Sequence, residues 1–229
     1  TLIGLDRPQT GGQTSIENPE VKKLEDELKD LRHQYFNART RTQKRTCQEK
    51  DKDLRKKIAE MLVKDGWNKD SARSVAAFDP YDQNASSPFF DPEWMYGITD
   101  GFDVVIGNPP YGADIDDFIK LFEKLYPKTS KGFKDIFKYF FNCSLSKLTR
   151  KNGVLCFITP NTFFLQPRFG DLRKYLLEYN ILSLINLGED VFEAVVPTAI
   201  SIVKGSKASA KNQIKFADIS DASKYSGSI

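Results

Sequence analysis

The chain has 229 residues, of which 40% are hydrophobic and 28% are charged, with 34 Lys or Arg against 31 Asp or Glu. These values are ordinary for a globular protein and favour neither a fibrous nor an intrinsically disordered one. No apolar run approaches the roughly 20 residues that span a membrane. The three cysteines, Cys47, Cys143 and Cys156, form no C-x-x-C pair, so no metal site is predicted. We expect a cytoplasmic protein with reduced thiols and no membrane partner.

The sequence begins Thr1-Leu2-Ile3-Gly4, with no initiator Met, no basic leader and no apolar signal core. We therefore expect a piece of a longer polypeptide, in which residues 1–19 continue from a preceding part.

A helical hairpin is predicted for residues 20–66, which are nearly free of Pro and Gly. Asn37, Thr40 and Thr42 offer turn and N-cap chemistry between two helices. The apolar stripes of these helices are Leu24, Leu28, Leu31 and Tyr35, and then Leu54, Ile58, Met61 and Leu62.

The hairpin carries the net positive charge of the chain. Residues 20–64 hold 14 Lys or Arg against 9 Asp or Glu, which leaves 20 against 22 for all other residues. Such an arm could contact DNA phosphates, although a charged helical pair is also typical of a solvated surface. The sequence leaves both interpretations open.

Beyond a predicted loop at residues 71–92, strands and helices alternate, which indicates an α/β fold. Too few residues separate the predicted strands 181–187 and 198–203 for a crossover helix, so these two are predicted to be antiparallel and the earlier ones parallel. The expected strands are 102–106, 154–159, 181–187 and 198–203, with a short fifth at 213–216, and the expected helices are 117–126, 133–148 and 172–177.

The first of these strands runs into the segment FDVVIGNPPYG, residues 102–112. Ligands of open parallel sheets bind at the carboxyl ends of strands, and two prolines make the bend after Asn108 rigid. The Asn108 side-chain oxygen and the Pro109 carbonyl are two fixed acceptors for a nitrogen with two donors, such as the exocyclic amine of a base. Tyr111 offers a flat face, and stacking on a base is worth about 1–3 kcal/mol.

This segment resembles the target-amine motif of S-adenosylmethionine-dependent adenine-specific DNA methyltransferases. Residues 90–97, 154–163 and 188–200 are similar to Eco57I-like methylases of type II restriction–modification systems. The resemblance implies the C-terminal part of a Rossmann-like methyltransferase sheet, with parallel strands plus an antiparallel edge hairpin and an inserted helical hairpin. It also implies a site-specific enzyme that methylates the N6 amine of a flipped adenine in double-stranded DNA.

The resemblance assigns roles to single residues. Asn108 and Pro109 would accept the two amine hydrogens, and Asn108 and Pro110 would lie near the methyl group of the cofactor. Tyr111 would stack on the adenine, and Phe192 would pack against it from another side. Direct attack by the amine needs no nucleophile, and the one histidine, His33, belongs to the charged hairpin.

Two expected parts of such a methyltransferase are missing from the sequence. No glycine-rich cofactor turn of the F-x-G-x-G type is present, and no target-recognition region follows. We therefore expect residues 67–205 to be the catalytic half of a methyltransferase domain, residues 206–229 to lead to the missing recognition region, and the isolated chain to be inactive. Specificity or restriction modules are expected in the parent protein.

Two alternatives to a DNA methyltransferase remain open. The motif also suits the side-chain amide of a protein glutamine, because this amide offers two donors on one nitrogen. The chain could instead be a non-catalytic fragment that binds DNA or a protein partner. The DNA recognition sequence, DNA cleavage and the oligomeric state are beyond the sequence.

Overall fold

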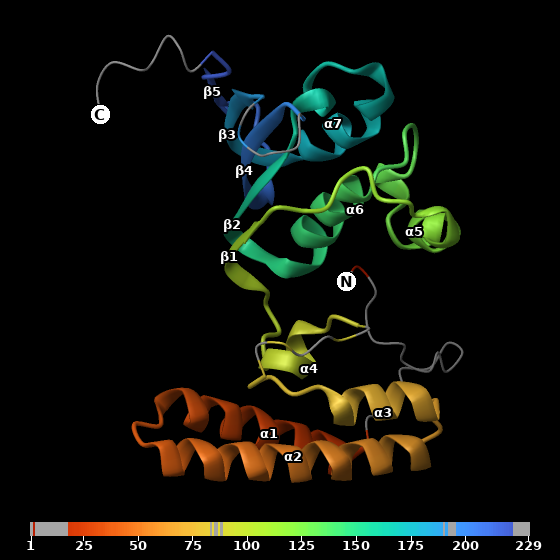
Figure 1. Ribbon diagram of the computed structural model, residues 1–229, viewed down its shortest axis with the longest axis vertical. Helices are drawn as coiled ribbons and strands as arrows, with labels where there is room; N and C mark the ends of the chain where they lie inside the picture. The colour runs from red at the N-terminus through yellow and green to blue at the C-terminus, as the bar shows by residue number, and fades with distance from the viewer. Residues whose placement is uncertain are drawn as a thin grey trace. The chain divides into compact units, whose positions relative to one another are not determined.

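The structure is a computed structural model that describes residues 2, 18–82, 84, 87, 89–189, 191 and 196–221. The chain divides into two compact units, Thr1–Thr99 and Asp100–Ile229. The first unit is helical, and the second is a mixed α/β unit (Figure 1). Within the described residues, no helix combines the length and apolar character that crossing a membrane requires.

The predicted helical hairpin is confirmed as α1 (Pro19–Asn37) and α2 (Arg41–Lys64). A capping box begins α2, as the Gln43 backbone N–H donates to Thr40 Oγ1 and the Thr40 N–H donates to Gln43 Oε1, both at 3.2 Å. Pairing these orphan donors fixes the residue at which the chain enters α2. The hairpin therefore has a sharply defined turn.

The predicted loop at residues 71–92 is wrong in its first part. The helix α3 (Lys69–Ala77) begins at its N-cap Asn68 and buries Ala72 and Val75 against the hairpin. Ser and Asp weaken a helix in isolation, but burial of an apolar stripe outweighs that weak preference. A short helix, α4 (Pro92–Tyr96), completes the described helices of this unit.

A buried carboxylate lies at the centre of the first unit. Asp51 is fully buried and accepts hydrogen bonds from Arg32 Nε at 2.9 Å, Arg55 Nε at 2.6 Å and the Tyr81 hydroxyl at 3.0 Å. Burial and the Asp51 carboxylate raise the pKa of Tyr81, so this hydroxyl remains a donor. One aspartate thus connects α1, α2 and the segment after α3.

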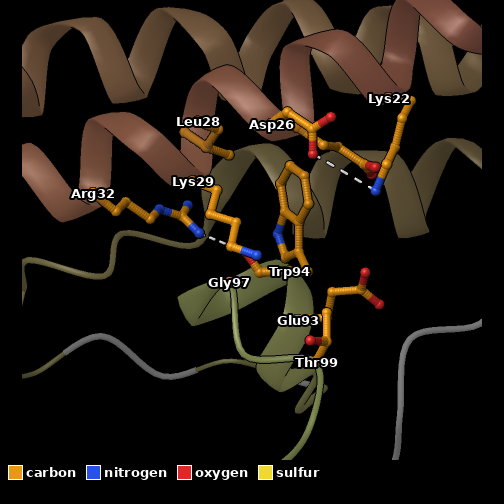
Figure 2. A pocket seen from close by; sticks show the side chains of 10 residues that line it. Lys22, Asp26, Leu28, Lys29, Arg32, Glu93, Trp94, Gly97 and Thr99 are labelled. Carbon is orange, nitrogen blue, oxygen red and sulfur yellow. Dashed lines mark hydrogen bonds and ion pairs between the residues drawn. The ribbon is translucent and has the colours of Figure 1, made fainter.

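The two arginines extend these connections to the backbone. Arg32 donates through Nη1 to the carbonyls of Trp94 and Met95, the latter at 2.8 Å, and Arg55 donates to the Ala76 carbonyl at 2.6 Å. Figure 2 shows the Arg32 side chain reaching from α1 toward Trp94 of α4. Its guanidinium carbon lies 5.9 Å from the centroid of the indole ring. The ion pair therefore ties both α3 and α4 to the hairpin.

The substitution Asp51→Ala is expected to lower the free energy of unfolding of the first unit by about 3–5 kcal/mol, because two buried guanidinium groups lose their counter-charge. Urea unfolding followed by tryptophan fluorescence measures this unit alone, since both tryptophans, Trp67 and Trp94, belong to it. The control is Glu49→Ala, which removes an exposed pair with Arg45 and is expected to cost less than about 1 kcal/mol. Equal costs for the two variants would contradict the assigned role of Asp51.

The second unit contains a five-stranded mixed sheet in the order β1-β2-β4-β3-β5. As predicted, β1 is parallel to β2, while β3 and β4 are antiparallel. The antiparallel hairpin does not form the edge, however, because β5 adds to β3 in parallel. The strands are β1 (Phe102–Gly107), β2 (Thr149–Pro160), β3 (Tyr179–Gly188), β4 (Thr198–Lys207) and β5 (Lys215–Asp218).

Helices of this unit cover one face of the sheet, where α6 and α7 pack (Figure 1). On this face Leu155 and Val203 are fully buried, whereas Val104 and Ile106, which point to the other face of β1, are 61% and 78% exposed. The helices are α5 (Ile119–Leu125), α6 (Ile136–Cys143), which continues in a π turn (Ser144–Leu148), and α7 (Gly170–Leu176). Short 3₁₀ turns are Asp116–Phe118, Pro127–Thr129, Asn161–Phe164 and Pro167–Phe169.

Candidate functional site

The segment Asn108–Tyr111 lies at the carboxyl end of β1 and leads away from the sheet. Gly107, the last residue of β1, pairs with Phe157 of β2, and a Cβ at this glycine would lie 3.3 Å from the Phe157 ring. Glycine therefore permits the two strands to pack closely just before the bend. The motif therefore begins directly after a residue that the sheet holds by strand pairing.

The end of β2, the end of β3 and the start of β4 lie on the same side of the sheet as the carboxyl end of β1. Beyond its pairing with β1, β2 continues to Pro160, which pairs with Thr198 at the start of β4, and Thr198 also pairs with Gly188 at the end of β3. The structure thus brings together three segments that the sequence analysis had singled out separately. This edge is the location expected for a ligand site in an open α/β sheet.

The four contiguous site residues, Asn108 to Tyr111, differ in solvent exposure, and this difference leaves a hydrogen-bond acceptor open to solvent. Asn108 and Pro110 are exposed, Pro109 is buried, and Tyr111 is half-buried against the aromatic core of the unit. Within the described part of the chain, the Asn108 side chain makes no hydrogen bond. Its amide oxygen is therefore available to a ligand. The fifth predicted site residue, Phe192, lies outside the described residues.

Asp135, which the sequence analysis did not select, contacts the end of this segment. Its carboxylate is buried, caps α6 at the Phe137 N–H and accepts the Gly112 N–H at 3.4 Å. Gly112 has a φ of 66°, a conformation that favours glycine. An Asp directly before an aromatic helical run is an N-cap signature, and this signal could have identified the residue.

The segment after β2 is fixed by an amide network. The Asn161 backbone N–H donates to the Pro197 carbonyl at 2.9 Å, and its side-chain amide donates to Asn186 Oδ1 at 2.8 Å. Asn186 in turn donates to Asp218 Oδ1 at 3.1 Å. These bonds connect the ends of β2 and β3 to β5, so the backbone beside the candidate site is well constrained.

The chemistry available around the motif is that of hydrogen-bond acceptors and an aromatic face. Among the described residues, no group of three or more His, Cys, Asp or Glu is placed to hold a metal ion. Burial raises the pKa of Cys156 in β2, which keeps its thiol protonated. The arrangement around Asn108 is suited to holding a polar nitrogen beside a planar ring.

One family model and two named relatives match parts of the chain. The model for the Eco57I restriction-modification methylase family matches residues 16–192. A protein of Methanocaldococcus jannaschii, named as a type II restriction enzyme and methyltransferase, is 42% identical over 106 residues, which are 45% of this chain and 9% of that protein. The type II methyltransferase M.TthHB8I of Thermus thermophilus is 29% identical over 116 residues, which are 43% of this chain and 27% of that protein. The chain thus spans less than a third of the length of either relative.

Partial likeness to solved structures is found as well. The methyltransferase subunit of a type I restriction-modification system from Streptococcus thermophilus has a TM-score of 0.46 and 23% identity, with 66% of this chain and 33% of that chain covered. A class I S-adenosylmethionine-dependent methyltransferase from Listeria monocytogenes has a TM-score of 0.44 and 22% identity, with 54% of this chain and 38% of that chain covered.

Replacing Asp135 separates its capping role from its charge. Asp135→Ala is expected to lower the free energy of unfolding of the second unit by about 1 kcal/mol, because the cap of α6 is lost. Asp135→Asn keeps an acceptor oxygen and is expected to cost less. Urea unfolding followed by circular dichroism measures both, and an Ala variant as stable as the Asn variant would contradict the capping role.

The stability difference between Asp135→Asn and wild type is expected to depend on pH, and the pKa of Asp135 gives the direction. Burial raises the pKa of Asp135, although the Gly112 N–H opposes the shift. The contribution of this carboxyl to stability is therefore fully present below its unfolded pKa of about 3.9 and is lost as the pH rises through the folded value. The stability of Asp135→Asn relative to wild type should accordingly increase between about pH 3.5 and pH 7. A constant difference would contradict the raised pKa.

Proposed function

The chain belongs to the Eco57I restriction-modification methylase family, and from this premise we propose that its residues 67–205 form the catalytic half of a site-specific DNA adenine N6-methyltransferase, the half that holds the target amine. The observation that carries the proposal is the exposed Asn108 amide at the carboxyl end of β1, next to two prolines and a packed tyrosine. The parent protein would act on double-stranded DNA within a restriction–modification system, together with specificity or restriction modules.

Asn108 and Pro109 supply two acceptors for one amine. The Asn108 amide oxygen is exposed, and Pro109 is buried with its φ fixed by the ring. Hydrogen bonds from the two N6 hydrogens to these oxygens would orient the nitrogen and leave its lone pair directed at an incoming methyl group. The proline rings restrict the backbone that carries the Pro109 carbonyl, so this acceptor needs little rearrangement during the reaction.

Tyr111 supplies the surface on which the target ring lies. Its ring is half-buried against the core of the second unit, which holds the side chain in place while part of it stays accessible. Stacking of about 1–3 kcal/mol per base would offset part of the few kcal/mol needed to flip a base out of the duplex. Phe192 would contact the base from another side.

Methyl transfer to an amine held by Asn108 and Pro109 would need no general base. The N6 nitrogen would bond to the methyl carbon as the methyl–sulfur bond breaks, with the neutral thioether S-adenosylhomocysteine as the leaving group. The positive charge would pass to the nitrogen, and one N6 proton would then be lost to solvent. Asn108 and Pro109, as acceptors, would stabilise the hydrogens that carry this developing charge. The protein therefore acts by binding, orientation and electrostatics rather than through a covalent intermediate.

S-adenosylmethionine would supply the methyl group, but the described residues fit only its reactive end. Asn108 and Pro110 would lie near the methyl group, and neither can hold a nucleotide or an amino-acid moiety. The strands of the second unit are not followed by the glycine-rich turn that cradles such a cofactor. We propose that the 229-residue chain alone neither binds the cofactor tightly nor methylates DNA.

In the full-length protein, Asn108→Ala is expected to lower the rate of adenine methylation by about 10²–10³-fold, because one charge-stabilising partner is lost. Tyr111→Ala is expected to weaken binding of the flipped base by about 1–3 kcal/mol. Incorporation of labelled methyl groups into duplex DNA measures both variants. The control is Lys151→Ala, an exposed residue of β2 at the opposite end of the strand. Full activity of Asn108→Ala would refute the assignment.

For the isolated chain, isothermal titration calorimetry with S-adenosylmethionine is expected to show no binding at micromolar concentrations. The physical reason is the lack of a glycine-rich turn and of an acidic ribose partner in the sequence. The full-length protein serves as the positive control. Micromolar binding by the 229-residue chain would show that its own residues form the cofactor site.

A further inference from the structure

The net positive charge of the helical hairpin comes from its tip, defined here as residues 31–48. The tip holds five Lys or Arg and no Asp or Glu, whereas the rest of residues 20–64 holds nine of each. We propose that this tip is a DNA-binding surface that contacts phosphates. The choice of DNA as the partner rests on the proposed function, but the surface is separate from the residues that hold the target amine.

Four of the five basic side chains of the tip are exposed: Arg39, Arg41, Lys44 and Arg45. Arg41 begins α2, and within the described residues neither Arg39 nor Arg41 has an acidic partner. Lys44 lies over the Tyr35 ring, 5.3 Å from its centroid, and Arg45 pairs with Glu49 at 3.1 Å on the surface. Most of the positive charge therefore remains available to an anion.

A hollow of about 850 Å³ accompanies these charges between the end of α1 and the start of α2. Among the residues that the structure describes, none with a carboxylate lines it. Its polar lining includes His33, Gln34, Asn37, Arg39, Thr40 and Gln43. Side chains of these types make most protein contacts to phosphate and sugar oxygens, together with backbone N–H groups at helix starts. The hollow therefore suits a polyanionic backbone better than an apolar ligand.

Phe36 adds an aromatic contact next to the basic residues. Its ring is 76% exposed at the end of α1 and meets the Tyr35 ring edge-on at 5.8 Å between centroids. An isolated exposed aromatic residue needs no explanation by itself. Beside a surface of net positive charge, however, it resembles the aromatic groups that stack on bases or wedge between them.

The tip is also held rigidly, which lowers the entropic cost of binding. The capping box of Thr40 and Gln43 fixes the turn, and Asp51 locks α1 to α2 below it. The N-terminus of α2 lies within the tip, so its helix dipole adds to the positive potential. A merely solvated helical surface would carry mixed charges, as the remainder of the hairpin does.

Fluorescence anisotropy with a labelled 25-base-pair duplex tests the proposal on the 229-residue chain. The tip variant is Arg39→Ala, Arg41→Ala and Lys44→Ala combined. It is expected to bind at least about tenfold more weakly, with a log–log salt slope reduced by about 0.9 for each phosphate that the variant no longer neutralises. The control removes three exposed lysines from the same hairpin outside the tip: Lys52→Ala, Lys56→Ala and Lys57→Ala.

The control variant is expected to bind within about twofold of wild type at the same salt concentration, since non-tip charges only add to the diffuse field. Circular dichroism verifies that both variants keep their helix content. Equal weakening of DNA binding in the two variants, or unchanged DNA binding by the tip variant, would overturn the proposal. If the tip variant binds DNA unchanged but binds an acidic peptide more weakly, the tip would be assigned to a protein partner instead. Because the assay measures binding and not methyl transfer, its outcome is independent of which group accepts the methyl.

Discussion

Two consecutive prolines after β1 set the geometry on which the candidate site depends. Neither Pro109 nor Pro110 has a backbone N–H, and both have a fixed φ, so the strand cannot continue and the bend cannot relax. Pairing of Gly107 with Phe157 holds the residue just before the bend. The Asn108 side chain is consequently presented to solvent instead of to the sheet.

Supporting contacts transmit this constraint through the second unit. Asp135 joins the end of the motif to the start of α6, and the aromatic core beneath the sheet packs against Tyr111. Asn161 and Asn186 hold the neighbouring strand ends. The site is thus built on a rigid scaffold, which is what orientation of a weakly nucleophilic amine requires.

In the first unit, Asp51 has the comparable role, because its three donors fix the hairpin whose tip carries the basic surface.

Local patterns were sufficient to predict the hairpin, the main strands and the location of the motif. Apolar periodicity, with turn and N-cap residues between the two stripes, predicted α1 and α2, and chain length between strands predicted the antiparallel pair. The helix α3 was missed because its buried residues, Ala72 and Val75, stabilise it only through tertiary packing. The pairing of β5 with β3 was missed because strand order depends on interactions between residues distant in sequence.

The candidate site shows the same division between local and distant information. Asn108 to Tyr111 are contiguous and carry their own backbone restriction, so the sequence alone places them at a strand end. Asp135 lies 23 residues from Gly112, and only the fold shows that its carboxylate reaches that N–H. The buried pair of Arg32 with Asp51 was hidden for a similar reason, since charged residues in a polar hairpin resemble surface residues until packing is known.

The central claim is that Asn108 and its neighbours hold the N6 amine of adenine. Mass spectrometry of nucleosides from DNA treated with the full-length protein and S-adenosylmethionine tests it most directly. The account predicts N6-methyladenine as the one methylated nucleoside formed. Methylated cytosine, or a methyl group found on a protein glutamine with unmodified DNA, would contradict it.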